Sequence, residues 1–252
     1  MKILWLSANR LGLELLTESF SVAESHISGI LTLAPDSRTI MYDSVSLSAW
    51  EKFGKPIHLI ERIEESAELI RGIGPDLLVM CGWRQILPKS ILQIPQHGVI
   101  GFHPTLLPYG RGPAPIINSI LHGIRNSGLS MYYLTEGLDD GDIVAQEQFL
   151  IEDTDHAEDV YEKVIGAGKK LIHSQLPLLL QGKASRTPQD NSKAHIFSKP
   201  TLRDNEIDLS SDSIESASRK IRALSHPYRG AFIREGGKKL VIWRAELAEA
   251  DK

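Results

Sequence analysis

A histidine that follows a short apolar run is the first residue of this chain that could do chemistry. The run Val99–Phe102 is bounded by glycine and proline, which is typical of an interior strand of a parallel sheet, and His103 comes at its end. Open α/β sheets bind ligands at the carboxyl ends of their strands. An imidazole titrates near neutral pH, so His103 could move a proton there. The alternative is a core histidine bonded to a backbone carbonyl.

Two polar segments could complete a site with His103. The first, HPTLLPYGRGPAP at 103–115, combines prolines that stiffen the backbone with glycines that allow unusual conformations. The second, LDDGDIV at 138–144, lies between two expected strands and contains Asp139. Taken alone, this acidic segment could equally be a solvated turn or a weak cation site. A carboxylate beside the imidazole would orient the ring and stabilise its cation.

Both segments resemble motifs of one family, the folate-dependent formyltransferases. HPTLLPYGRGPAP is similar to that family's HPSLLPxxRGxxP signature, and LDDGDIV is similar to its DxGDI loop, whose catalytic aspartate corresponds to Asp139. The tail from Phe197 onward resembles the family's smaller C-terminal domain, so the resemblance covers nearly the whole chain. It implies an enzyme that moves a formyl group from N10-formyltetrahydrofolate to an amine, with His103 and Asp139 as its catalytic residues.

The chain departs from the family at position 101. The family has a strand asparagine two residues before the histidine, whereas this chain has Gly101. One hypothesis is that a water molecule or Asn118 supplies the missing hydrogen-bond donor. The other is that the protein is a catalytically impaired folate or sugar-nucleotide binding protein.

The resemblance also implies residues that bind the donor and the acceptor. In the family, the loop that corresponds to CGWRQILP lines the pterin pocket. The expected folate-binding residues, on this loop and on the loop of Asp139, are Trp83, Arg84, Ile86, Leu87, Glu136, Leu138 and Asp142. The expected substrate-binding residues are Asn9, Arg10, Thr105, Tyr109 and Arg111. Plainer alternatives are that Trp83 plugs the sheet edge, that Asn9 caps a helix and that Arg10 is solvated. No metal site is expected.

Charge bears on the acceptor. The formal net charge is −4, from 28 basic and 32 acidic residues, which gives no electrostatic case for binding nucleic acid. The tRNA-formylating members carry a basic insertion in this half of the domain, but residues 35–55 include only Arg38, Lys52 and Lys55 as basic side chains. The expected acceptor is therefore the amine of a nucleotide-linked amino sugar. The alternative is a methionyl-tRNA formyltransferase, and a homodimer is possible.

Strands and helices alternate along the first 182 residues. This order predicts an α/β fold with a Rossmann-like, mostly parallel sheet and helices on both faces. The link SANRLG after the first strand lacks GxGxxG, which disfavours dinucleotide binding. Expected strands lie at 2–7, 26–34, 56–60, 77–81, 99–102, 129–134 and 143–151, and expected helices at 11–20, 64–72, 88–94, 113–122 and 155–181.

The rest of the chain predicts a smaller unit. Residues 1–182 form the expected catalytic domain, 183–196 a polar linker, and 197–252 a small β-rich, OB-like domain. The tail should hold a helix at 213–224 and strands at 231–234 and 239–245. The single cysteine, Cys81, excludes an intrachain disulfide and lies in an apolar run, so a buried, inert thiol is expected. No apolar run reaches the roughly 18 residues of a membrane span, and a cytoplasmic protein is expected.

Overall fold

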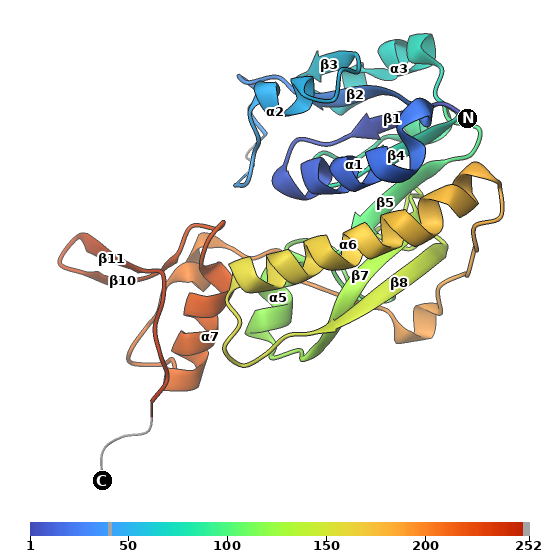
Figure 1. Cartoon of the computed structure of the whole chain (residues 1–252). Helices are drawn as coiled ribbons and strands as arrows, with labels where there is room; N and C mark the ends of the chain where they lie inside the picture. Colours follow the sequence, from blue (N-terminus) through green and yellow to red (C-terminus); the bar gives the residue numbers. More distant parts are fainter. Residues whose placement is uncertain (40–41, 249–252) are drawn as a thin grey trace.

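The fold is built on one seven-stranded sheet (Figure 1). The structure, a computed structural model, describes residues 1–39 and 42–248, apart from the side chain of Leu202. The strand order is β3-β2-β1-β4-β5-β7-β8, and neighbours from β3 to β5 run parallel. The mostly parallel sheet is therefore confirmed. Its strands are β1 (Ile3–Leu6), β2 (Ile27–Leu33), β3 (Ile57–Ile60), β4 (Leu77–Met80), β5 (Val99–His103), β7 (Asn126–Tyr133) and β8 (Ile143–Leu150).

Strand β5 is an interior strand, as expected, but only one of its two neighbours is parallel to it. The strand runs parallel to β4 but antiparallel to β7, which is also antiparallel to β8. A parallel neighbour needs a connection that carries the chain back to the starting end of the sheet. The connection here, through α5 (Pro115–Leu121), does not do so. The strand that follows His103 in sequence therefore lies beside it and points the opposite way.

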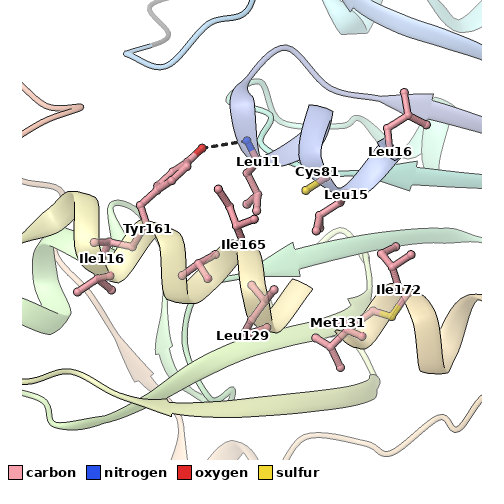
Figure 2. Packing of buried hydrophobic residues seen from close by; sticks show 14 of the residues in the cluster. Leu11, Leu15, Leu16, Cys81, Ile116, Leu129, Met131, Tyr161, Ile165 and Ile172 are labelled. Atoms are coloured by element: carbon pink, nitrogen blue, oxygen red, sulfur yellow. Dashed lines mark hydrogen bonds between the residues drawn. The ribbon is translucent and has the colours of Figure 1, made fainter. Parts of the chain in front are cut away.

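The strands bury side chains on both faces of the sheet. Ile3 and Trp5 of β1 belong to the cluster packed under α1 (Arg10–Ala23) and α6 (Ala157–Leu180). Alternate β1 side chains belong to a second cluster, which α3 (Ala67–Ile73) and α4 (Lys89–Leu92) cover. Helices on both faces are thus confirmed. Figure 2 shows the first cluster, in which the amide of Leu11 donates to the Tyr161 hydroxyl at 3.0 Å.

The second face is completed by loops where α3 and α4 do not reach. Val99 belongs to the α3/α4 cluster and Ile100 to the α1/α6 cluster, so alternation places Gly101 and His103 on the same face as Val99. A methyl group built on Gly128 of β7 would lie 2.4 Å from the Leu106 side chain, so the loop after β5 packs directly on this face. His103 therefore lies under loops rather than under a helix.

The C-terminal segment packs against the large sheet domain. Helix α7 (Ile214–Leu224) contacts α5 and α6, and its Ile221 and Leu224 join the α1/α6 cluster. The expected small antiparallel strand pair is present as β10 (Ala231–Glu235) and β11 (Lys238–Ile242). Within the described tail this hairpin is not closed into a barrel. The remaining elements are α2 (Leu47–Glu51), β6 (Tyr109–Arg111), β9 (His195–Ile196) and the 3₁₀ helices η1 (Glu24–His26), η2 (Ile63–Glu65), η3 (Asn191–Lys193) and η4 (Leu202–Asn205).

Two glycines of α6 test the packing of α6 on α1. A Cβ atom at Gly168 would lie 2.6 Å from the buried Leu15 side chain, whereas a Cβ at the exposed Gly166 meets nothing within 4 Å. We expect Gly168→Val to lower the free energy of unfolding by about 1–3 kcal/mol through overpacking. Gly166→Val should change it by less than about 0.5 kcal/mol, because valine and glycine differ little in helix propensity. Urea denaturation measures both, and equal midpoints would contradict close packing at Gly168.

Candidate functional site

His103 is buried and faces two oxygen atoms. Its Nε2 lies 2.7 Å from the carbonyl oxygen of Gly110, and its Nδ1 lies 3.6 Å from Oδ2 of Asp139. A carbonyl only accepts, so Nε2 carries a hydrogen and Nδ1 is the nitrogen that can gain or lose a proton. The ring does bond a backbone carbonyl, as the core alternative required. It also faces the carboxylate that the sequence motif indicated.

The Asp139 carboxylate is held through both oxygens. Oδ1 accepts from the Tyr132 hydroxyl at 2.6 Å, and Oδ2 accepts from the Gly112 amide at 2.8 Å. The backbone at Asp139 is left-handed, with φ of 47°, a conformation that aspartate tolerates better than most residues. These contacts fix the plane of the carboxylate and direct Oδ2 at His103.

The loop after β5 is shaped by close contacts that only glycine permits. Gly110 has a φ of 79°, and a Cβ atom there would lie 2.7 Å from the Phe197 ring and 2.8 Å from the Thr105 side chain. Ser130 of β7 fixes the same loop, since its hydroxyl donates to the Thr105 carbonyl at 2.6 Å and accepts from the Leu107 amide at 3.0 Å. The Gly110 carbonyl that faces His103 is therefore rigidly placed.

The 183–196 segment connects this loop to the loop of Asp139. Arg111 donates to Oε1 of Gln189 at 2.7 and 3.0 Å, and to Asn191 at 2.9 Å. The Gln189 amide then donates to the carbonyls of Asp139 and Gly141 at 2.9 and 2.7 Å. Arg111 is 7% exposed, so in this structure its guanidinium braces two loops and is not displayed to solvent.

Four further substrate-binding candidates lie in two places. Thr105 is buried and its hydroxyl donates to the Gly110 carbonyl at 3.3 Å. Tyr109 is 46% exposed and stacks on His195, with ring centroids 4.7 Å apart. The remaining two, Asn9 and Arg10, lie at the start of α1.

Asn9 caps a helix, as the alternative interpretation expected, and Arg10 lies at the surface in an ion pair. Asn9 caps α1 by accepting from the Gly12 amide at 3.1 Å, and its own amide donates to Asp43 at 2.9 Å. Arg10 forms an ion pair with Glu162 of α6. These contacts hold both side chains at the start of α1, and none of them involves His103.

Three folate-binding candidates share the loop of Asp139. Glu136 and Asp142 line a groove of about 550 Å³, whose other walls are Gly98, Val99, part of 133–141 and Arg186. Leu138 is half exposed and lies beside Gly112. The size of this groove falls within the range of small-molecule sites, roughly 300–1,000 Å³.

The other four candidates lie on the loop after β4. Trp83 and Leu87 pack in the α3/α4 cluster, which also contains Val99 and Leu134 of the groove wall. Trp83 therefore packs against the core at this end of the sheet, as the alternative interpretation expected. Its buried indole N–H, however, has no acceptor among the described residues. Ile86 is 90% exposed, and the Arg84 guanidinium lies 4.5 Å from the Tyr42 ring centroid.

Comparison with known proteins shows which family the chain resembles in sequence. Residues 56–176 match the Formyl transferase family and residues 200–252 match the Formyl transferase C-terminal domain. A methionyl-tRNA formyltransferase of Halalkalibacterium halodurans is 37% identical over 204 residues, which are 80% of this chain and 64% of that protein. Another, of Carboxydothermus hydrogenoformans, is 31% identical over 229 residues, 89% of this chain and 74% of that protein.

Solved structures show the same fold at lower sequence identity. A sugar N-formyltransferase from Shewanella has a TM-score of 0.77 at 21% identity and covers 99% of both chains. An N-formyltransferase from Helicobacter canadensis, solved with folinic acid and dTDP-3-aminofucose, has a TM-score of 0.73 at 17% identity and covers 94% of this chain and 85% of that one.

The fold and the sequence matches together define an α/β enzyme of one-carbon group transfer. The chain belongs to the formyl transferase family, whose formyl donor is N10-formyltetrahydrofolate. The described residues include no helix long and apolar enough to cross a membrane. Within the same residues, no three histidine, cysteine or carboxylate side chains gather as metal ligands.

Some site contacts were not expected from the sequence. Tyr132, Ser130 and Gln189 were assigned only to a strand or a linker, yet each holds a loop of the site. Strand alternation would have placed Ser130 and Tyr132 on the face of His103 once the antiparallel pairing was known. The expected burial of Cys81 is confirmed, and burial raises the pKa of its thiol well above the usual range.

The space above Gly101 is filled. A Cβ atom there would lie 2.2 Å from the Leu134 side chain and 3.1 Å from the Tyr132 ring. Asn118, one hypothesised substitute donor, instead donates to the carbonyls of Pro113, Ala114 and Ser198 at 2.9 to 3.2 Å. Its amide therefore has no hydrogen left for position 101, and that hypothesis is wrong.

These contacts predict the result of restoring an asparagine. Gly101→Asn should lower turnover and reduce stability by about 1–3 kcal/mol, because the new side chain displaces Leu134 and Tyr132. Leu134→Ala in the same chain should recover part of the lost stability by making room. Thermal unfolding and a turnover assay measure both effects. A variant with raised turnover and parental stability would show that position 101 is open.

Proposed function

We propose that this protein transfers the formyl group of N10-formyltetrahydrofolate to the amine of a nucleotide-linked amino sugar. The observation that carries the proposal is the buried His103 with its Nδ1 3.6 Å from the anchored Asp139 carboxylate. The donor supplies an activated formyl carbon. The protein must then remove a proton from the attacking amine and stabilise the negative charge that develops on the formyl oxygen.

His103 and Asp139 can meet both needs. Nδ1 of His103 can accept the proton of the amine, since Nε2 keeps its hydrogen on the Gly110 carbonyl. Asp139 stabilises the resulting imidazolium by its opposite charge, and the protonated ring can donate to the oxyanion or return the proton to the leaving nitrogen. The proton lost by the amine is gained by the folate nitrogen that releases the formyl group, so the protein ends the reaction in its starting protonation state.

The residues present fit the formyl donor. The groove beside the Asp139 loop has the volume of a small-molecule site. Its wall shares Val99 and Leu134 with the cluster that contains Trp83, whose buried N–H has no acceptor among the described residues. We propose that Trp83 and Leu87 support the pterin wall, and that Ile86, Leu138, Glu136, Asp142 and Arg84 form the remaining folate-binding residues.

Three features support a sugar nucleotide as the acceptor. The chain is acidic overall, and residues 35–55 carry three basic side chains. The exposed ring of Tyr109, stacked on His195, offers a flat apolar surface on the loop that follows His103. The Helicobacter canadensis neighbour was solved with an amino-sugar nucleotide.

A second candidate is formylation of methionyl-tRNA, which the curated relatives favour. Two methionyl-tRNA formyltransferases are 37% and 31% identical to this chain, although the chain spans only 64% and 74% of their lengths. An assay of the purified protein with N10-formyltetrahydrofolate should compare UDP- and dTDP-linked amino sugars with methionyl-tRNA. Tetrahydrofolate release with formylated sugar detected by mass spectrometry supports the proposal. Formylation of methionyl-tRNA alone would replace it with the second candidate.

Conservative substitutions test the two catalytic residues. We expect His103→Gln and Asp139→Asn each to lower kcat by about 10²-fold or more, the usual contribution of a general acid or base. Folate binding and the circular dichroism spectrum should stay parental. The matched control is His173→Gln, which changes an exposed histidine of α6 that lies 3.5 Å from Glu18 of α1, in the helical layer on the face of the sheet away from His103. Near-parental kcat in either site variant would remove that residue from the mechanism.

A further inference from the structure

Tyr132 lies directly across the sheet from Gly101. The two residues are register partners in the antiparallel pair of β5 and β7, so their side-chain positions point to the same face, which is also the face of His103. Tyr132 is 4% exposed, and its ring comes within 3.1 Å of the position that a Cβ atom of residue 101 would take. The Leu134 side chain, 2.2 Å from the same position, is the closer neighbour, and the Tyr132 ring would be pressed more lightly by a side chain at position 101.

The hydroxyl of Tyr132 is a permanent donor to the catalytic carboxylate. It lies 2.6 Å from Oδ1 of Asp139. Burial, and then the negative charge of Asp139, raises the pKa of Tyr132 well above its usual value, and Asp140 adds to this effect. The hydroxyl thus keeps its hydrogen under all ordinary conditions.

The Tyr132 hydroxyl holds one oxygen of the Asp139 carboxylate, and a different group holds the other. Oδ2 of Asp139 accepts from the Gly112 amide and faces Nδ1 of His103 at 3.6 Å. A carboxylate held through one oxygen can rotate about its Cβ–Cγ bond, whereas one held through both cannot. The Tyr132 hydroxyl therefore decides whether Oδ2 stays directed at His103.

We propose that Tyr132 is a positioning residue for the Asp139–His103 pair, and that glycine at position 101 leaves room for its ring and for the Leu134 side chain beside it. This inference rests on the proposed function. It links two features that look independent in the sequence, a strand glycine two residues before the histidine and a strand tyrosine seven residues before the aspartate. The hydroxyl that braces the Asp139 carboxylate comes from Tyr132 of β7. Strand β5 contributes a position without a side chain, Gly101, beside the Tyr132 ring.

Removal of the hydroxyl is the direct test. Tyr132→Phe should lower kcat by about tenfold or more, the effect of losing one well-placed hydrogen bond to a charged group. The KM for N10-formyltetrahydrofolate and the folate dissociation constant should change by less than about twofold, because the groove wall keeps its shape. A role in stability alone would leave kcat unchanged.

A second variant reaches the same hydrogen bond from the other strand. Gly101→Ala leaves the hydroxyl in place but pushes on Leu134 and the Tyr132 ring, so kcat should again fall. If both changes act on one hydrogen bond, the double variant should be no slower than the slower single variant. Effects that multiply would show that Gly101 and Tyr132 act separately and would overturn the link between them.

Tyr161→Phe is the matched control. Its buried hydroxyl also donates to a carboxylate, that of Asp43, away from His103. Tyr161→Phe should lose at least as much stability as Tyr132→Phe, because the Tyr161 hydroxyl also accepts from the Leu11 amide and the Asn9 side chain, and only Tyr132→Phe should lose kcat. Parental kcat in Tyr132→Phe with an active parent would overturn the role of Tyr132 alone. A parent inactive with every acceptor would instead overturn the transferase function, and this inference with it. If Tyr132→Phe does not fold, Gly101→Ala is measured in its place, and parental kcat there would overturn the proposed link between Tyr132 and Gly101.

Discussion

The two-point attachment of the Asp139 carboxylate is the interaction on which the site depends. A carboxylate can direct an imidazole only if its own orientation is fixed, and here the loop after β5 holds one oxygen and strand β7 holds the other. The same two elements fix His103, which leaves β5 and bonds the loop carbonyl of Gly110. Histidine, aspartate and tyrosine are thus parts of one rigid unit, and any displacement of the loop would be transmitted to both proposed catalytic groups.

This unit lies where helices leave one face of the sheet uncovered. Helices α1 and α6 cover one face, and α3 and α4 cover only part of the other. Loops complete the second face, and loops can place backbone amides and carbonyls beside a ligand, whereas those inside a helix are bonded to one another. The consequence is that each loop must be braced separately. Ser130 and Gln189 provide those braces, and Phe197 packs where Gly110 has no side chain.

The glycine at position 101 is explained by its neighbour. In the formyltransferases that the chain resembles, an asparagine occupies this strand position, and its absence suggested a damaged site. The structure shows the space filled by Leu134 and Tyr132, with the Tyr132 hydroxyl hydrogen-bonded to the Asp139 carboxylate. A donor is therefore present in the same region, although it comes from the neighbouring strand. The absence of the asparagine is for this reason weak evidence for loss of activity.

The sequence by itself determined the elements, the sheet class and the two motifs that meet. Apolar periodicity marked each strand of the sheet within a few residues, and the motifs HPTLLPYGRGPAP and LDDGDIV singled out His103 and Asp139 without any structure. Only the tertiary structure decided which side chains support them. Tyr132, Ser130 and Gln189 look ordinary in sequence because their roles come from partners that are between 7 and 50 residues away along the chain. The direction of β7 set those partners, since reversing a strand changes which residues face one another, and a local pattern carries no information on strand direction.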